Sequence, residues 1–365
     1  MADTRVLLVT GEFPPQAGGV GDYTDLLRDA LGEHGISVTV YAPDGGDRPG
    51  VVSYGKWGWR AARRVGPVAR RAGAQIVHIQ YQAGAFDMHP STNILPWLLR
   101  RTTPVVTTFH DLRPPYLFPK ASFVRRFAVL RMARASAAVI ATNPFDARTL
   151  DRAGIGVVEI PIGPNLPAPD GRSTPDLRTV AFFGLPSRSK GIVELIEAIG
   201  LIDSRRRPRL LLIGDAGSPS ENNDLVPIDA LERLATDNEV RLDRTGYLSA
   251  REASNALADA GVIALPFQRG ASLRSGSLLA ALQSGRPVVT TAPSSTEALR
   301  DLGTMPQLIV IPRGDTGRLW DAIETGLGAS SGGAALPARY GWDSIAAAHA
   351  DVYADVAGRW RRRAG

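Results

Sequence analysis

The stretch VLLVTGEFPPQAGGVGDYTDLLRDAL, residues 6–31, shows the order of structural elements that recurs along the chain. Its start, Val6–Thr10, is a short apolar and β-branched run, which predicts a buried strand. A glycine-rich loop, Pro14–Gly21, leads from this strand into Asp22–Leu31, which has the pattern of an amphipathic helix. A strand, a glycine turn and a helix in this order are typical of a parallel α/β sheet.

The same alternation continues through the first half of the chain. Continuous apolar strands separated by helix-like segments indicate a parallel sheet that is covered by helices on both faces. The strands of this half are expected at Val6–Thr10, Val38–Tyr41, Ile76–Ile79, Val105–Phe109, Ala138–Ala141 and Val157–Ile160.

A second α/β pattern begins after a clear break. The segment GPNLPAPDGRSTPD, residues 163–176, contains four prolines and has no periodicity, so it is interpreted as an inter-domain linker. Beyond it, strands are expected at Thr179–Phe183, Leu210–Ile213, Val240–Leu242, Val262–Leu265, Val288–Thr291 and Leu308–Ile311. Helices are expected at Gly191–Ile202, Ile228–Ala235, Ala250–Ala260, Ser277–Ser284, Ser295–Leu302, Thr316–Leu327 and Trp342–Arg363.

The length supports this division, because 365 residues exceed what one hydrophobic core usually organises. We expect two doubly wound, Rossmann-like domains that face each other across a cleft. Ligands bind beyond the carboxyl ends of the strands in such sheets, so the cleft is the expected site. The expected boundaries are 1–165 for the N-terminal domain, 166–176 for the linker, 177–340 for the C-terminal domain and 341–365 for a final helix.

The composition excludes several classes of protein. Hydrophobic residues make up 44% and charged residues 21%, which is ordinary for a globular chain and unlike a disordered or collagen-like one. The absence of cysteine excludes disulfides, thiolate metal sites and a cysteine nucleophile. No apolar run reaches membrane-spanning length and the N-terminus does not resemble a secretory signal, so a soluble cytoplasmic protein is expected.

The formal net charge of +6 is concentrated in one region. Residues 1–170 contain 19 Lys and Arg against 14 Asp and Glu, and much of the excess lies in KWGWRAARRVGPVARRAG, residues 56–73. A basic helix with tryptophans can lie at the surface of an anionic membrane, although an arginine-rich helix facing solvent has the same pattern. Nucleic acid is not an expected partner, because no nucleic-acid-binding motif accompanies the charge.

Two glycine turns are candidate phosphate sites. Gly18 and Gly19 precede the first helix, where free backbone N–H groups can approach a phosphate or a sugar, although a simple tight turn is equally compatible. In FFGLPSRSKG, residues 182–191, Arg188 and Lys190 stand at the entrance of a helix. Two cations beside free N–H groups can bind a diphosphate; the alternative is a lysine that reaches solvent from a first turn.

A third candidate lies in LPFQRGASLRSGSLLAALQSGRPVVTT, residues 265–291. Arg274 precedes Ser275, Gly276 and Ser277, which open a helix. A serine can cap that helix, and an arginine beside a helix N-terminus suits an anion. The alternative is an ordinary strand-loop-helix unit whose arginines face water.

His110 ends the apolar strand TPVVTTFHD. A histidine at the carboxyl end of a parallel strand can bond a substrate hydroxyl or transfer a proton, but it can equally be structural. The other histidines, His34, His78, His89 and His349, have no metal-ligand spacing, and no metal is expected.

In combination these motifs resemble a GT-B glycosyltransferase of the large retaining family 4. The resemblance covers nearly the whole chain in the same order. The matching segments are GEFPPQAGGVGDYTDLLRDAL (11–31), TFHD (108–111), IPIGPN (160–165), FFGLPSRSKGIVELIEAI (182–199), GYLSAREASNALADAGVIALPF (246–267), LQSGRPVVTT (282–291) and YGWDSIAAAHADVYADV (340–356).

The resemblance implies a hexosyltransferase that moves a sugar from a nucleotide-diphosphate sugar to an acceptor hydroxyl, with retention and without metal or cofactor. The acceptor domain would be N-terminal and the donor domain C-terminal, with the last helix crossing back to the N-terminal domain. Positioning and charge neutralisation would then provide most of the rate enhancement. By position, Gly18 and Gly19 would meet the donor phosphates or sugar, His110 the hexose, Lys190 and Arg274–Ser277 the diphosphate, and Gly246–Tyr247 the nucleobase.

The chain departs from the family pattern at two points. The arginine that usually follows the first glycine is Leu185 here, so Arg188 or Arg274 would supply the second cation. The family's paired glutamates would fall at Ser272 and Ala280, so donor sugar and ribose would be held differently.

These departures keep two alternatives open: a GT-B enzyme with a changed reaction, such as cyclitol coupling or nucleotide-sugar hydrolysis, and a non-catalytic sugar-nucleotide-binding protein. A glycolipid, a surface polysaccharide or a natural product would be the acceptor, recognised by loops near Gln80–Pro90 and Arg113–Lys120.

Overall fold

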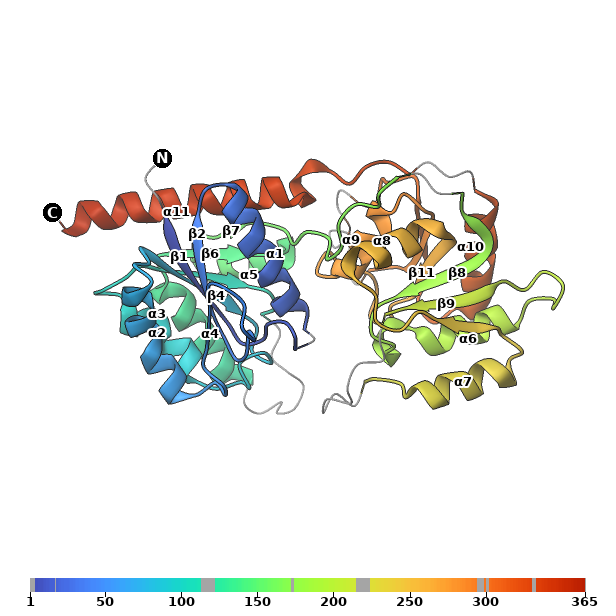
Figure 1. Ribbon diagram of the computed structural model, residues 1–365, viewed down its shortest axis with the longest axis horizontal. Coiled ribbons are helices and arrows are strands. Elements are labelled where there is room, and N and C mark those ends of the chain that lie inside the picture. Colours follow the sequence, from blue (N-terminus) through green and yellow to red (C-terminus); the bar gives the residue numbers. More distant parts are fainter. Residues whose placement is uncertain are drawn as a thin grey trace. The chain divides into compact units, whose positions relative to one another are not determined.

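The computed structural model describes residues 4–16, 18–112, 122–171, 174–214, 224–293, 299, 302–329 and 333–364. The chain forms two compact units (Figure 1). The first contains Met1–Gly163 and Arg339–Gly365, and the second contains Pro164–Ala338. The predicted loop Arg113–Lys120 and most of the predicted helix Ser295–Leu302 lie outside the described residues.

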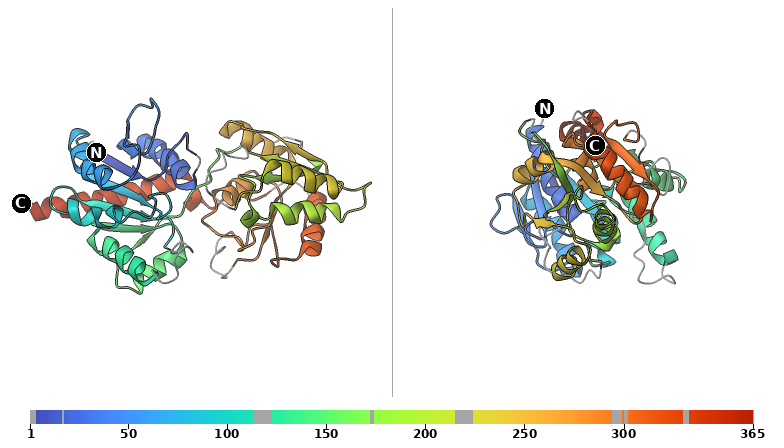
Figure 2. Two further views of the ribbon diagram at one scale, coloured as in Figure 1. Left: turned by 90° about the horizontal axis from the view of Figure 1, so that it is seen from below. Right: turned by 90° about the vertical axis from the view of Figure 1, so that its right-hand side faces the viewer.

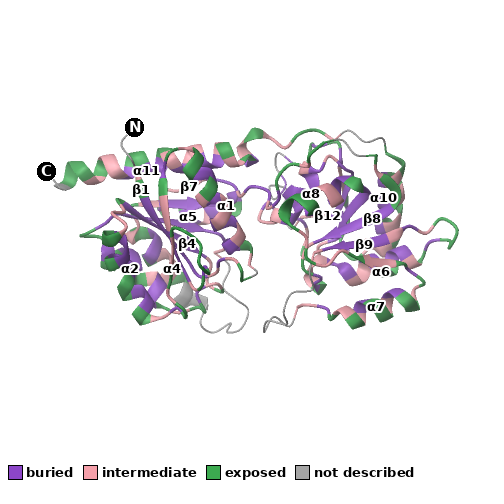
Figure 3. Cartoon of the chain, in the orientation of Figure 1, coloured by how far each residue is buried: buried purple, intermediate pink, exposed green. Residues whose placement is uncertain are grey.

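The N-terminal unit is built on a seven-stranded sheet with the order β3-β2-β1-β4-β5-β6-β7, and all its described strand pairs are parallel. The apolar runs of the sequence form these strands, which are almost completely buried in the middle of the sheet (Figure 3). Their bounds are β1 Arg5–Thr10, β2 Ser37–Ala42, β3 Val51–Ser53, β4 Ile76–Tyr81, β5 Val105–Phe109, β6 Ala138–Ala141 and β7 Val158–Glu159.

Helices cover both faces of this sheet, as continuous apolar strands require. One face packs against α2 (Trp59–Arg71), α3 (Ser91–Leu99), α4 (Ser122–Ala135) and α5 (Pro144–Asp151). The other packs against α1 (Gly19–Glu33) and the last helix, α11 (Trp342–Ala364). Helix α11 therefore belongs to the N-terminal unit, along which it lies in Figure 2.

The C-terminal unit repeats the architecture with a six-stranded sheet of order β10-β9-β8-β11-β12-β13, again with parallel pairs throughout its described strands. Its strands are β8 Asp176–Phe183, β9 Arg209–Ile213, β10 Leu242–Arg244, β11 Ala260–Leu265, β12 Val288–Thr291 and β13 Leu308–Ile311. Its helices are α6 Ile192–Gly200, α7 Ile228–Asp237, α8 Ala250–Asp259, α9 Gly276–Gln283 and α10 Thr316–Gly328.

The predicted elements differ from the observed ones mainly at their ends. Strand β3 is missing from the prediction, because Val51–Ser53 is short and only partly buried at the sheet edge. Strand β10 lies two residues later than predicted, at Leu242–Arg244, because polar Asp243 and Arg244 pair with β9. Among the described residues, no helix has the length and apolar character needed to cross a membrane.

Candidate functional site

The first candidate site is the turn that follows β8 in the C-terminal unit. Gly184 has φ +108°, in the left-handed region that favours glycine. A Cβ at this position would stand 2.5 Å from Nζ of Lys190, so only glycine lets the ammonium approach the backbone. Burial lowers the pKa of Lys190 to about 8. The turn therefore holds a half-buried lysine with a desolvated ammonium group at the carboxyl end of a central strand.

Asp224 and Gln268 hold this turn in place. The carboxylate of Asp224 accepts hydrogen bonds from the backbone N–H of Ser189 at 3.2 Å and from the Ser189 hydroxyl. The backbone carbonyl of Asp224 accepts the N–H of Arg188 at 2.9 Å, and the carbonyl of Ser189 accepts the N–H of Gln268 at 2.9 Å. The turn after β8 is thus tied to the loop after β11.

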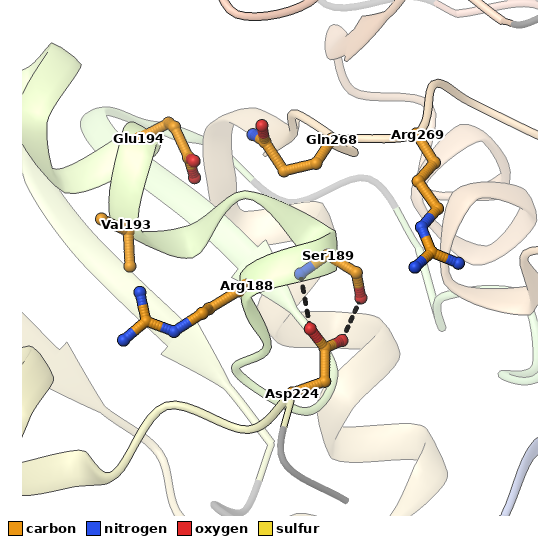
Figure 4. Close-up of a pocket in the computed structure, with 7 residues that line it drawn as sticks. All are labelled: Arg188, Ser189, Val193, Glu194, Asp224, Gln268 and Arg269. Atoms are coloured by element: carbon orange, nitrogen blue, oxygen red, sulfur yellow. Dashed lines mark hydrogen bonds between the residues drawn. The ribbon is translucent and has the colours of Figure 1, made fainter. Parts of the chain in front are cut away.

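A pocket of about 280 Å³ opens between these two loops (Figure 4). Two arginines from different loops, Arg188 and Arg269, line it, and the carboxylate of Glu194 lies between Arg188 and Gln268. Two guanidinium groups can bind an anionic ligand, but the carboxylates of Glu194 and Asp224 also line the cavity and balance their charge. The complete lining is Arg188, Ser189, Val193, Glu194, Asp224, Gln268 and Arg269.

The loop after β11 ends at the capped start of α9. Ser275 is the N-cap residue, and its hydroxyl accepts the N–H of Leu278 at 3.3 Å and lies 3.0 Å from the hydroxyl of Ser277. The N–H of Arg274 donates to the hydroxyl of Ser272 at 3.3 Å. A capped helix N-terminus next to an arginine carries positive potential.

The two positions at which the family glutamates would fall offer no carboxylate. Ser272 is half-buried in the loop and bonds to the backbone of the next turn, and Ala280 is only 3% exposed within α9. The predicted base contact, Tyr247, lies between β10 and α8 and is 84% exposed. It follows Gly246, which has φ +67° and bridges to Gly214 at the end of β9.

The equivalent turn of the N-terminal unit carries a negative charge. The carboxylate oxygen of Glu12 accepts the N–H groups of Val20 at 2.7 Å and Gly21 at 3.2 Å, in the first turn of α1. A Cβ at Gly18 would stand 2.3 Å from the Glu12 carboxyl carbon, so a side chain at this position would displace the carboxylate. Gly19 begins the helix. The amides of Val20 and Gly21, which follow Gly18 and Gly19, are thus occupied by the protein's own carboxylate.

A second carboxylate lies beside the first. Burial, together with the charges of Glu12 and Asp25, raises the pKa of Asp22 to about 6. Burial also raises the pKa of Glu12, although the two amide bonds oppose this shift. These acidic groups disfavour a phosphate at the start of α1, whereas sugar hydroxyls can donate hydrogen bonds to them.

His110 lies at the carboxyl end of β5 and is 8% exposed. Its Nε2 is 2.9 Å from Oε1 of Gln80, and its ring forms a T-shaped contact with the Tyr23 ring, with centroids 4.8 Å apart. Burial lowers the pKa of His110 to about 3, so the ring is neutral at physiological pH. A neutral imidazole acts as one donor and one acceptor.

The predicted residues therefore fall into two groups. Arg188 and Lys190 lie together on one turn of the C-terminal unit, with Arg274–Ser277 on the loop tied to it and Tyr247 on a third loop. Gly18, Gly19 and His110 belong to the N-terminal unit. The described residues contain no cluster of His, Asp and Glu that could hold a metal ion.

Three residues around these groups were missed as site residues: Glu12, Asp224 and Gln268. Gln80 was predicted only as the start of a loop that recognises the acceptor, whereas it belongs to strand β4 and bonds to His110. Gln80 could have been found, because it is a polar residue near the end of the fully buried strand IVHIQY. The sequence gives no indication of the role of Asp224, because its partner Ser189 is 35 residues away.

The fold is that of GT-B glycosyltransferases: two Rossmann-like units with parallel sheets. The sequence model of Glycosyltransferase Family 4 matches residues 17–165, and the model of Glycosyl transferases group 1 matches residues 177–328. The two matches together span most of the chain, and the protein belongs to the glycosyltransferases of family 4.

Known proteins show the same fold at low identity. Sucrose-phosphate synthase from Thermosynechococcus elongatus is 18% identical, with a TM-score of 0.71 and coverage of 97% of this chain and 99% of that one. Anabaena HepE, solved in complex with UDP-glucose, is 16% identical, with a TM-score of 0.66 over 98% of this chain and 99% of that one.

One curated relative is similar over a limited region. It is a GDP-mannose-dependent α-(1-6)-phosphatidylinositol monomannoside mannosyltransferase from Mycobacterium tuberculosis. The match is 33% identical over 94 residues, which is 26% of this chain and 18% of the relative.

Proposed function

We propose that the protein is a retaining, metal-independent hexosyltransferase that uses a nucleotide-diphosphate sugar. The observation that carries this proposal is the desolvated ammonium of the half-buried Lys190, which lies against Gly184 at the end of a central strand. Departure of a nucleoside diphosphate concentrates negative charge on its phosphates, and a preorganised cation lowers the barrier by stabilising that charge. Arg188 and the start of α9 would supply further positive potential in the same unit.

In the proposed reaction the acceptor oxygen bonds to the anomeric carbon on the face that the diphosphate leaves. The bond between that carbon and the diphosphate oxygen breaks, and the acceptor proton passes to the departing diphosphate. Lys190 and Arg274 neutralise the leaving group, and the exposed Tyr247 ring provides a surface on which a nucleobase can stack. His110 and Gln80 lie in the other unit, where a neutral sugar can be bound.

The proposal is tested by screening purified protein against nucleoside diphosphates and their sugars in thermal unfolding. A ligand at about a hundred times its Kd raises the free energy of unfolding by roughly 2.7 kcal/mol. Transfer of sugar, detected by mass spectrometry and unaffected by EDTA, would support the proposal. Loss of the hexose to water, or coupling to a cyclitol, would replace it with the changed-reaction alternative. Ligand binding without any turnover would favour the alternative of a non-catalytic sugar-nucleotide-binding protein.

We further propose that the acceptor is lipid-linked and that α2, α3 and α4 meet an anionic membrane. All three helices cover the same face of the sheet, and α3 packs against both α2 and α4, so their exposed sides point outward together. Residues 56–86 contain no Asp or Glu. The exposed side of α2 carries Trp59, Pro67 and the arginines Arg60, Arg63, Arg64, Arg70 and Arg71.

The neighbouring helices add apolar area to this face. Trp97 and Leu98 of α3 are 50% and 44% exposed, and Phe127 of α4 is 55% exposed. Arg100 lies over the Trp97 ring at 4.8 Å, and Arg131 lies over the Phe127 ring at 5.8 Å. Aromatic side chains surrounded by arginines are suited to the interface of an anionic bilayer.

Co-sedimentation with vesicles tests this contact. Binding to vesicles that contain phosphatidylglycerol, but not to pure phosphatidylcholine, is expected, and Arg60→Glu/Arg63→Glu/Arg64→Glu should abolish it. The matched control exchanges three exposed arginines of the C-terminal unit, Arg178→Glu/Arg205→Glu/Arg313→Glu. Equal binding to both vesicle types, or an equal loss of vesicle binding in both variants, would remove the support for a lipid-linked acceptor. A soluble acceptor would then be favoured.

A further inference from the structure

A line of polar side chains crosses the core of the N-terminal unit between the sheet and α11. His78 and Gln80 are two residues apart on β4, so they point to the same face of the sheet. Gln80 pairs in register with Thr108 of β5, and His110 follows two residues later on the same side. All four side chains are buried, with Gln80 fully enclosed at 0% exposure. A buried polar chain of this length requires partners at each step.

The contact between Gln80 and His110 determines which ring nitrogen of His110 carries hydrogen. An amide oxygen only accepts hydrogen bonds, so with Oε1 of Gln80 at 2.9 Å the His110 Nε2 is the protonated nitrogen. The neutral ring then has its lone pair on Nδ1. His110 is thereby prepared to accept a hydrogen bond from a hydroxyl group at Nδ1.

Gln80 is itself held from the other side. Its amide nitrogen lies 3.3 Å from Nε2 and 3.5 Å from Nδ1 of His78. Those two nitrogens bond to hydroxyl groups: Nδ1 to Tyr353 of α11 at 2.6 Å, and Nε2 to Thr108 at 2.7 Å. The amide nitrogen of Gln80 therefore lies against the His78 ring, which Thr108 and, from the last helix, Tyr353 hold in place.

We propose that Gln80 is the positioning residue of His110, fixing its neutral Nε2–H form so that Nδ1 accepts a hydrogen bond from a hydroxyl of the sugar or the acceptor. This inference rests on the proposed glycosyl transfer for its functional part, but its structural part can be measured without substrate. Within the described part of the chain, the titratable groups that contact His110 or are electrostatically coupled to it include Tyr23 from α1, His78 from β4 and His349 from α11, and Asp111 follows it in the chain. Tyr23, His78 and His349 carry no carboxylate that could stabilise an imidazolium in place of Gln80.

Gln80→Glu is the informative substitution, because it keeps the size and the acceptor while adding a negative charge. A carboxylate on Nε2–H stabilises the imidazolium, so the pKa of His110 should rise into a range that can be titrated. ¹⁵N NMR of the histidine rings reads this directly. In the unsubstituted protein the His110 signals should show the neutral Nε2–H form from pH 5 to 8. In Gln80→Leu they should show a mixture of the neutral Nε2–H and Nδ1–H forms. A His110 that is Nδ1–H in the unsubstituted protein, or whose pKa is unmoved by Gln80→Glu, would overturn the inference.

Kinetics separate positioning from general stability. Gln80→Leu should lower kcat about tenfold with little change in the donor KM, and Gln80→Glu should lose activity as pH falls through the new His110 pKa and regain it above. The matched control is Thr107→Val, which removes a partly buried hydrogen bond from β5 to Ser136 on the opposite face of the sheet. An equal loss in the control would mean a structural role only. If the unsubstituted protein transfers no sugar, the proposed function fails while the NMR result still decides the inference.

Discussion

The two units place opposite charges at equivalent turns of the same architecture. After β1, the turn of the N-terminal unit directs the Glu12 carboxylate onto the first amides of α1. After β8, the turn of the C-terminal unit directs the Lys190 ammonium against Gly184. Both turns join a central strand to a helix that packs on the sheet. The fold therefore provides two equivalent turns, and in the first of them a carboxylate of the protein already binds two amides of the helix.

The units differ in the same way in their titratable side chains. All five histidines belong to the N-terminal unit, and the C-terminal unit has none. Three of them, His78, His110 and His349, are buried, and burial lowers the pKa of each. The N-terminal unit thus buries neutral polar groups suited to hydroxyls, whereas the C-terminal unit gathers cations suited to phosphates.

The largest expected effect is on the cation of the C-terminal unit. Lys190→Ala should remove about 2–4 kcal/mol of transition-state stabilisation, a fall of roughly 30- to 1000-fold in kcat/KM, because one preorganised charge donor is lost. Initial rates with the preferred donor measure it. The control is Arg178→Ala, an exposed arginine near the other end of the same strand, which should be silent. If Lys190→Ala turns over substrate nearly as fast as the control, the proposal that the donor diphosphate binds at Lys190 in this unit is wrong.

The second prediction uses the histidines. A buried histidine that stays neutral in the folded unit, but binds a proton near pH 6.5 when unfolded, favours unfolding as pH falls below 6.5. For His349, whose pKa burial lowers to about 4, the loss should reach about 2 kcal/mol by pH 5. Hydrogen exchange of the full chain at pH 7 and pH 5 should show easier opening of the N-terminal unit.

The C-terminal unit should not respond over this range. The pKa values of Asp176 and Asp243 lie below their usual value, so their contribution is lost only at more acidic pH. In His349→Leu, the opening free energy of the N-terminal unit should vary less steeply between pH 7 and 5. Equal pH dependence in the two units would contradict the assignment of buried neutral histidines.

The fold could be predicted from the sequence because period and apolar runs are local properties. Runs such as Val105–Phe109 match the observed strands, and the alternation with helices implies both parallel sheets. The cations of the C-terminal unit could be predicted for the same reason, because Arg188 and Lys190 are close in sequence and lie in one glycine turn.

The remaining contacts depend on residues that are distant in sequence. Gln80 and His110 are 30 residues apart, and His78 and Tyr353 are 275 apart, so strand order and helix docking determine these pairs. Glu12 is only eight residues from Val20, yet its reach back to the helix depends on the course of the loop between them. A glycine motif predicts that backbone amides are accessible, and it does not predict which group will bind them.

The third prediction is that the turn after β1 can bind an anion once its own carboxylate is removed. Glu12→Ala should cost about 1–2 kcal/mol, since two amides lose a charged acceptor and become hydrated. The same change exposes a helix N-terminus to anions, so inorganic phosphate should raise the melting temperature of the variant more than that of the unsubstituted protein. Glu33→Ala, at the far end of α1, is the control. No gain in response to phosphate would show that the turn is closed to anions for another reason.

The smallest effect is expected at the capped start of α9 in the C-terminal unit. Ser275→Ala removes the acceptor of the Leu278 N–H and should lower the free energy of unfolding by about 1 kcal/mol.

Ser275→Asp separates the cap from the charge. Aspartate caps a helix as well as serine does, so stability should be retained, but its negative charge would stand where the donor diphosphate is proposed to bind. Titration with a nucleoside diphosphate should then show weaker binding in Ser275→Asp than in Ser275→Ala, although the latter is the less stable protein. The opposite order of affinities would mean that α9 does not face the diphosphate, and that the positive charge of this unit acts through the turn of Lys190 alone.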